Sequence, residues 1–176
     1  EYCMPSRSAL LTGRYGLRYA MHALGHIVSI DTTKNELPLS AVTMGEEFQS
    51  AGYRTAAIGK WHTGYSSLSK YPTYRGFDYF YGFLAGETSQ YEPTLFENTN
   101  PIQAPHDPSY HLTEDMTEKA IEWLRTSNTL NPGTPFFMYF TPGAVHGPHH
   151  IFKEWADKYE GKFDEGWEAL REMTFE

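Results

Sequence analysis

The repeated order of helix, glycine and strand constrains the fold of this chain more than any other feature. The spacing of apolar residues predicts a helix over 43–51, with Met44, Phe48 and Ala51 on one face. Gly52 ends this helix, and a short buried strand over 53–58 follows at once. Helices that alternate with buried strands are typical of an α/β layer fold.

A second unit of the same kind lies later in the chain. Thr113 is expected to cap a helix that runs to about Arg125, with Thr117, Ala120, Ile121 and Leu124 on one face. A turn over 131–135 then leads to the apolar run 136–140, which is of the kind found in central strands. Residues 63–110 show no sustained period, so no element is predicted there.

Each unit ends in a loop that carries Lys or His. Lys60 and His62 follow the first strand, and His146 follows the second. In open α/β sheets, ligands bind beyond the carboxyl ends of the strands. Because Lys60 and His62 are two residues apart, an extended backbone would direct both side chains the same way. Lys60 as an ordinary loop cation, and His62 and His146 as structural histidines, are the alternatives.

Composition excludes several classes of protein. The chain has 176 residues and a net charge of −8, and it shows no basic stripe, which argues against a nucleic-acid partner. Aromatic residues make up 16% of the chain, which is unlike a disordered segment. No apolar run approaches the roughly 20 residues of a membrane-spanning helix. The single cysteine excludes an internal disulfide and any multi-cysteine metal site.

That cysteine, Cys3, stands just before a short helix predicted over 5–12. A helix N-terminus attracts anions, because its first backbone N–H groups are unpaired. Arg7 is four residues further on and can reach toward the same space. A buried cysteine beside a surface arginine is the alternative.

Four segments in order resemble the sulfatase family. Residues 3–14 resemble its signature, Cys-x-Pro-Ser-Arg followed by Ala-Leu-Leu-Thr-Gly-Arg, and residues 51–62 resemble its second signature, which ends in Gly-Lys-Trp-His. Residues 75–82 are similar to the Arg-Gly-Phe-Asp segment, and residues 135–148 to the strand that ends in His-x-Pro. Cys-x-Pro-x-Arg alone is weakly specific, but its extension makes an accidental match very improbable.

The resemblance implies a fold and an extent. The expected fold is α/β, an alkaline-phosphatase-like α/β/α sandwich around a mostly parallel mixed sheet, present only in part. Residues 1–176 are expected to be a partial sulfatase catalytic domain that lacks the first strand and the C-terminal part. Trp61 and the tyrosine-rich segment 71–91 are expected to pack, and Asp78 to make a structural hydrogen bond.

The resemblance also implies the chemistry of five residues. Cys3 corresponds to the cysteine that is oxidised to formylglycine, the hydrated aldehyde that attacks the ester sulfur. Arg7 corresponds to the arginine that steadies the formylglycine oxygens, and Lys60 and His62 to residues that contact the sulfate and the hydrate. His146 corresponds to a sulfate contact that also donates a proton to the leaving group.

The family's metal site has only one counterpart in this chain. Sulfatases bind a divalent cation, usually calcium, and Cys3 as formylglycine is the only ligand that the resemblance assigns here. Calcium takes six to eight oxygen ligands. The remaining ligands are therefore expected outside these residues, and the isolated chain is expected to be inactive.

The expected function is that of a sulfuric ester hydrolase, an arylsulfatase-like enzyme that cleaves sulfate monoesters of aryl or carbohydrate alcohols. Its expected partners are a sulfate-ester small molecule or sulfated glycan and, during maturation, a formylglycine-generating enzyme. The resemblance favours a periplasmic, secreted or lysosomal compartment. A phosphonate or phosphodiester hydrolase of the same superfamily, and a non-catalytic homologue that binds sulfated ligands, are the alternative functions.

Overall fold

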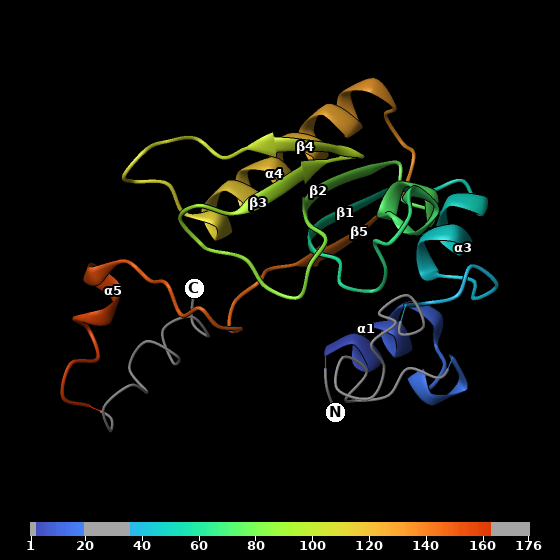
Figure 1. The fold of residues 1–176 in the computed structure, drawn as a ribbon. Helices are drawn as coiled ribbons and strands as arrows, with labels where there is room; N and C mark the ends of the chain where they lie inside the picture. Colours follow the sequence, from blue (N-terminus) through green and yellow to red (C-terminus); the bar gives the residue numbers. More distant parts are fainter. Residues whose placement is uncertain (1–2, 20–35, 163–176) are drawn as a thin grey trace.

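A mixed sheet with helices on both faces forms the centre of the molecule (Figure 1). The computed structural model describes residues 3–19 and 36–162. In this part the strands follow the order β4-β3-β2-β1-β5. Their bounds are β1 Arg54–Lys60, β2 Tyr79–Phe83, β3 Thr94–Glu97, β4 Asn100–Gln103 and β5 Phe136–Thr141. The helices are α1 Cys3–Thr12, α3 Met44–Ser50, α4 Leu112–Leu130 and α5 Lys153–Ala156.

The three strands that lead toward the candidate site are parallel. β1 lies between β2 and β5 and pairs with both in parallel, with Ala57 opposite Phe80 on one side and Tyr139 on the other. β3 and β4 extend the sheet in antiparallel pairing. The carboxyl ends of β1 and β5 therefore meet at one edge of the sheet, next to the residues predicted to carry the chemistry.

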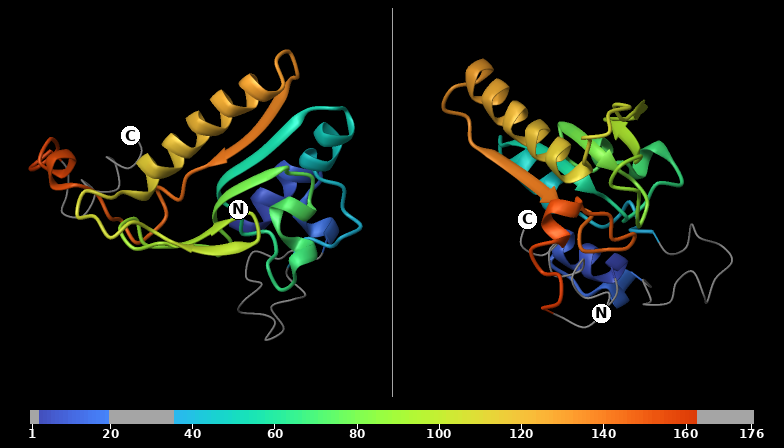
Figure 2. Two further views of the ribbon diagram at one scale, coloured as in Figure 1. Left: turned by 90° about the horizontal axis from the view of Figure 1, so that it is seen from above. Right: turned by 90° about the vertical axis from the view of Figure 1, so that its left-hand side faces the viewer.

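Helices cover both faces of the sheet, as the two further views show (Figure 2). On one face Ile58, Tyr81 and Leu95 pack under Met116 of α4. On the opposite face the neighbouring strand residues pack against Leu11 of α1 and around Phe77. This alternation follows from the pleat of a strand, which directs successive side chains to opposite faces. The predicted α/β fold, with helices on both sides of a mixed sheet, is confirmed.

The first predicted unit is confirmed with small shifts. Thr43 is the N-cap of α3, and its hydroxyl accepts a hydrogen bond from the backbone N–H of Glu46. The same hydroxyl donates to the carbonyl oxygen of Arg75. Strand β1 runs on to Lys60 instead of ending before Gly59, so Lys60 belongs to the strand and not to the loop after it.

The second unit differs from the prediction in its cap and in its buried face. His111, not Thr113, is the N-cap of α4, and its Nδ1 accepts a hydrogen bond from the backbone N–H of Thr113. The helix extends to Leu130. Its buried stripe contains Ala120, as predicted, but Ile121 is exposed. The remaining residues of the stripe are Leu112, Met116 and Ser127.

Two expectations about strands are wrong. The stretch 63–110 contains β2, β3 and β4, which were not predicted because they have only four or five residues each and are separated by Pro, Ser and Gly. β5 is an edge strand of the described sheet, not a central one, and Phe136 and Phe140 at this edge are partly exposed. No helix among the described residues is long and apolar enough to cross a membrane.

Candidate functional site

Cys3 is the first residue of α1, two residues earlier than the predicted helix start. This end of α1 faces the sheet edge where β1 and β5 finish (Figure 1). The Cys3 side chain is partly buried, and its Sγ lies 3.2 Å from Nδ1 of His62. The thiol stands where the oxygens of a formylglycine would be in a matured protein. His62 is thus placed to contact the group that resemblance assigns as the nucleophile.

Lys60, the last residue of β1, is the second cation beside Cys3. Its side chain is buried, with only 4% of the residue exposed, and its ammonium group is a hydrogen-bond partner of the Cys3 thiol. Burial lowers the pKa of Lys60 below its ordinary value of 10.5, while the contact with Cys3 acts in the opposite direction. A buried ammonium without an anion is costly, so this position favours an anionic ligand.

The backbone at His62 is not extended, contrary to the argument from two-residue spacing. His62 has a φ of 50°, and its N–H donates to the carbonyl oxygen of Leu84. Gly86 lies so close to the His62 ring that an added Cβ would stand 2.9 Å from Cε1. Lys60 and His62 both reach Cys3. His62 does so from a left-handed backbone conformation, which contacts with residues 84–86 hold in place.

Arg7 ties α1 to the ends of β1 and β5. Its Nη1 donates to the carbonyl oxygen of Lys60 at 2.7 Å and to the hydroxyl of Tyr139 at 3.0 Å. The Thr141 hydroxyl donates to the same Lys60 carbonyl at 2.9 Å. Tyr139 was not predicted as part of the site. Tyr139 pairs with Ala57 across the two strands, so its side chain lies on the same face of the sheet as that of Ala57, the face that packs against α1. The sequence alone does not predict which face of β1 packs against α1.

His146 lies in the segment that follows β5, and its side-chain contacts given below do not include Cys3, Lys60 or His62. In the described part of the chain, its polar contacts are with the carbonyl oxygen of Gly147, 2.8 Å from Nδ1, and with the carboxylate of Glu87, 3.4 Å from Nδ1. Both His146 and Glu87 are well exposed. Glu87 also interacts electrostatically with Lys60. No sequence motif singled out Glu87, which lies 59 positions from His146 in the sequence.

The structural interpretations of neighbouring residues are confirmed. Trp61 is buried, and its indole N–H donates to the carbonyl oxygens of Gly64 and Lys70. Asp78 accepts hydrogen bonds from the backbone N–H of Thr55 and from the side-chain amide of Gln49. These hydrogen bonds stabilise the strand and loop that carry Lys60 and His62, and they indicate a structural role for Trp61 and Asp78.

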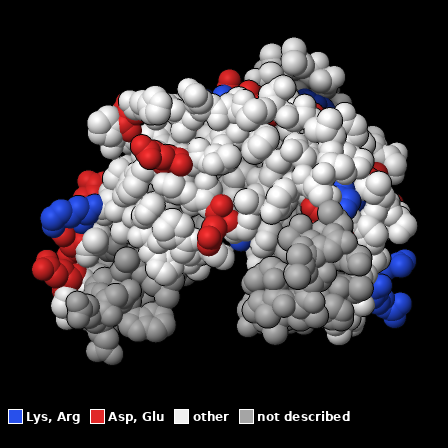
Figure 3. All heavy atoms as spheres, viewed as in Figure 1, with Lys and Arg blue, Asp and Glu red and all other residues white. Residues whose placement is uncertain are grey.

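The described residues do not fit a calcium ion. Among residues 3–19 and 36–162, no group of three or more His, Cys, Asp and Glu side chains is placed to hold a metal ion. Calcium requires six to eight oxygen ligands. The face drawn in Figure 3 carries scattered acidic residues and no continuous patch of Lys or Arg over the described part of the chain, in keeping with the net charge of −8.

Comparisons with known proteins place these residues in a family. The sulfatase family model matches residues 1–174. Arylsulfatase G of Rattus norvegicus is 33% identical over 178 residues, covering 83% of this chain and 32% of the relative. The uncharacterized sulfatase YdeN of Escherichia coli is 31% identical over 185 residues, covering 92% of this chain and 30% of the relative. The chain therefore spans about a third of the length of these relatives.

Solved structures share the fold. The crystal structure of Ps i-CgsB in complex with k-i-k-neocarrahexaose superposes with a TM-score of 0.81 and 23% identity, covering 98% of this chain and 41% of that one. BT4656 in complex with D-glucosamine-2-N,6-O-disulfate gives a TM-score of 0.67 and 24% identity, covering 92% and 29%. The match of the family model across nearly every residue, together with this fold, shows that the chain belongs to the sulfatase family.

Proposed function

We propose that the protein hydrolyses sulfate monoesters of aryl or carbohydrate alcohols, with a formylglycine derived from Cys3 as nucleophile. One observation carries the proposal. In a chain of the sulfatase family, the signature cysteine begins a helix and lies between a buried ammonium group, that of Lys60, and the imidazole of His62. Such a cluster suits a sulfate group, which brings negative charge to the buried cation.

The proposed reaction has two covalent steps. During maturation a generating enzyme and an external oxidant remove two electrons from Cβ of Cys3, the carbon–sulfur bond breaks with release of sulfide, and a carbonyl oxygen takes its place. Water then adds to the aldehyde. One hydroxyl of this hydrate attacks the ester sulfur, the bond from sulfur to the alcohol oxygen breaks, and the alcohol leaves with a proton. The second hydroxyl loses its proton, the bond from carbon to the sulfate oxygen breaks, and the aldehyde returns. The net reaction consumes one water.

The resemblance and the contacts of the other residues support the following roles. Arg7 holds the start of α1 against the end of β1, so it fixes the attacking oxygens relative to Lys60. Lys60 and His62 stabilise the charge on the sulfate and on the hydrate oxygens. His146 donates a proton to the departing alcohol oxygen, because imidazole is an effective proton donor near neutral pH.

The metal that the family implies is not part of these steps. The described side chains do not supply its ligands, and we propose that the catalytic domain extends beyond these 176 residues and provides them. The isolated 176-residue chain is then inactive even with formylglycine at position 3 and added calcium. Release of 4-nitrophenol from 4-nitrophenyl sulfate by that chain, well above the rate in buffer, would contradict this part of the proposal.

Sulfated glycans are the favoured natural substrates. BT4656, which shares the fold, is described with D-glucosamine-2-N,6-O-disulfate as its substrate, and Ps i-CgsB was solved in complex with k-i-k-neocarrahexaose. A periplasmic, secreted or lysosomal compartment belongs to the same proposal, and fractionation of cells that express the complete protein tests it.

The deciding experiment compares matched sulfate and phosphate esters of 4-nitrophenol, with the complete matured protein and its Cys3→Ala variant. The proposal expects a higher kcat/KM for the sulfate monoester, and loss of turnover in the variant at an unchanged unfolding temperature. Preference for phosphodiesters or phosphonates would favour the related hydrolases instead. Binding of sulfated glycans without turnover, with an unmodified thiol at Cys3, would favour a non-catalytic homologue.

A further inference from the structure

Nδ1 of His146 has a hydrogen-bond partner and an ion-pair partner. The carbonyl oxygen of Gly147 is 2.8 Å away, and a carboxylate oxygen of Glu87 is 3.4 Å away. Neither a backbone carbonyl nor a carboxylate can donate a hydrogen. Nδ1 must therefore carry a proton, which leaves Nε2 as the nitrogen that can take up or release a proton in a reaction.

Glu87 is held on the side of the site that contains Cys3. Its neighbour Gly86 packs against the ring of His62, close enough that an alanine Cβ would meet the ring at 2.9 Å. The N–H of His62 donates to the carbonyl oxygen of Leu84 in the same segment. The carboxylate of Glu87 also interacts with the charge of Lys60. Glu87 thus follows directly on the residue that packs against the His62 ring, and its carboxylate reaches His146.

The contact between His146 and the segment beside His62 depends on the Glu87 carboxylate. His146 is carried on the segment after β5, and it is about half-exposed, so packing alone does not fix its ring. The carbonyl of Gly147 belongs to the same segment and moves with it. Glu87 provides the contact that joins the imidazole to the segment beside His62.

We propose that Glu87 is a positioning residue for His146: its carboxylate, 3.4 Å from Nδ1, pairs with the protonated ring beside the hydrogen bond from Nδ1–H to the Gly147 carbonyl, and so directs Nε2–H toward the leaving oxygen of the substrate. The inference rests on the proposed hydrolysis of sulfate esters. When the bond from sulfur to the alcohol oxygen breaks, the proton on Nε2 moves to that oxygen, and the proton that the second hydroxyl of the intermediate later loses restores it. The Nδ1 proton stays in place and only sets the tautomer and the direction of the ring.

The consequence depends on the alcohol that leaves. A 4-nitrophenolate departs readily without a proton, whereas a phenol or a sugar alcohol leaves with difficulty unless the oxygen is protonated in the transition state. Loss of Glu87 should therefore slow esters of weakly acidic alcohols much more than esters of 4-nitrophenol. A purely structural role would slow all esters alike.

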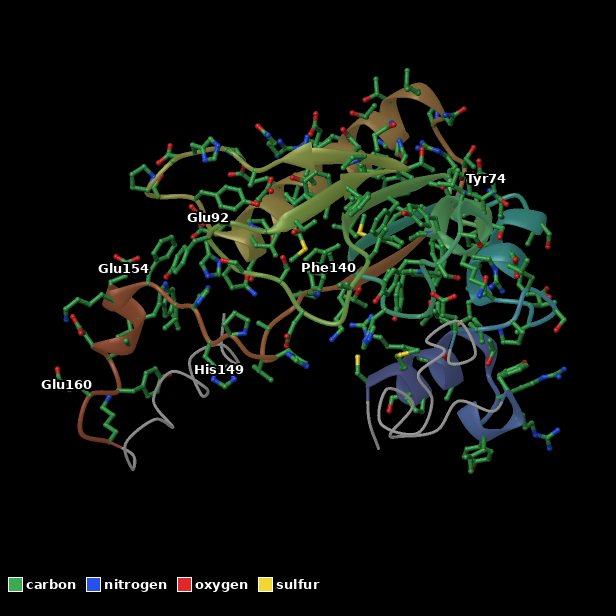
Figure 4. The ribbon with its side chains drawn as sticks, in the orientation of Figure 1. Tyr74, Glu92, Phe140, His149, Glu154 and Glu160 are labelled. Atoms are coloured by element: carbon green, nitrogen blue, oxygen red, sulfur yellow. The ribbon has the colours of Figure 1, made fainter. Side chains whose placement is uncertain are left out.

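The test uses the complete, matured protein and a series of aryl sulfates from 4-nitrophenyl to phenyl sulfate. For Glu87→Ala we expect kcat for phenyl sulfate to fall about 10- to 100-fold, no more than the lower end of the roughly 10²- to 10⁴-fold that a proton donor contributes, because Glu87 acts through His146. For 4-nitrophenyl sulfate we expect a fall of no more than about 3-fold. Glu87→Gln keeps an acceptor oxygen and should recover part of the loss. Glu92→Ala, an exposed carboxylate beside the start of β3 in Figure 4, is the control and should match the wild-type series.

The outcomes separate the two proposals. An equal fall for all esters in Glu87→Ala, or no fall for any, overturns the role of Glu87. If the wild-type protein with verified aldehyde turns over neither aryl sulfates nor sulfated glycans, the proposed function itself fails. Glu87 is 65% exposed, so the substitution should leave the unfolding temperature close to that of Glu92→Ala.

Discussion

Replacing Arg7 by lysine keeps the positive charge but removes the planar group that joins α1 to the sheet. A lysine ammonium is a point donor on a flexible stem and cannot reproduce the arginine geometry toward both the Lys60 carbonyl and the Tyr139 hydroxyl. A hydrogen bond from a charged donor contributes about 1.5–3 kcal/mol. The Lys60 carbonyl keeps its hydrogen bond from the Thr141 hydroxyl, so this acceptor is not left without a partner. We expect Arg7→Lys to lower the free energy of unfolding by about 1.5–3 kcal/mol.

Denaturant titration of the complete protein, followed by tryptophan fluorescence, measures this difference. Arg14→Lys is the matched control, because Arg14 is exposed and a surface substitution of this kind changes stability by no more than about 0.5 kcal/mol. Tyr139→Phe removes one of the two acceptors of Arg7 and should cost about 1 kcal/mol. The double variant should lose less than the sum, since both changes remove the same contact.

Equal stability of Arg7→Lys and Arg14→Lys would refute this reasoning. Strict additivity of Arg7→Lys and Tyr139→Phe would show that the contact between them contributes nothing. In either case the start of α1, and with it Cys3, would be held in place by something other than Arg7.

Three further predictions concern residues around the site. Thr43→Ala removes the α3 cap and the hydrogen bond to the Arg75 carbonyl, and should lower the free energy of unfolding by about 2 kcal/mol, measured by denaturant titration. Lys60→Met should abolish turnover yet raise stability at neutral pH. Because burial lowers the pKa of Lys60, the folded wild-type protein releases this proton at a lower pH than the unfolded chain, and its stability rises with pH between the lowered pKa and 10.5. Lys60→Met should flatten that rise in unfolding curves recorded from neutral to alkaline pH, and an unchanged rise would contradict the assignment. Gly86→Ala forces the His62 ring to move and should reduce kcat/KM for 4-nitrophenyl sulfate by about 10²-fold, as expected for a displaced catalytic group. A variant with wild-type kinetics would show that the position of His62 is not limiting.

The regular elements could be predicted where the chain gives a strong local pattern. The helix capped by Thr43 and the strand after it have apolar spacing, a cap and a terminating glycine, so local sequence determines them. The strands within 63–110 have only four or five residues each, and long-range pairing with β1 defines the first of them, β2. The edge position of β5 is likewise set by which strands pair, and that information is not contained in its own apolar run.

The sequence predicted most of the residues that form the candidate site but not how their side chains are arranged. The family motifs located Cys3, Arg7 and Lys60, yet the expected end of the strand before Gly59 misplaced Lys60 in a loop. The positive φ of His62 depends on the contact with the segment after β2, which no local rule anticipates. Glu87 lies 59 positions from His146, so only the folded chain brings the two side chains together.

The central claim is that an aldehyde formed from Cys3 carries the reaction. Its most direct test measures turnover of 4-nitrophenyl sulfate in preparations of the complete protein that differ in the fraction of residue 3 present as formylglycine, determined by peptide mass spectrometry. The account predicts that turnover rises in proportion to that fraction and is absent when only the thiol is present. Turnover that does not depend on the aldehyde fraction would contradict it.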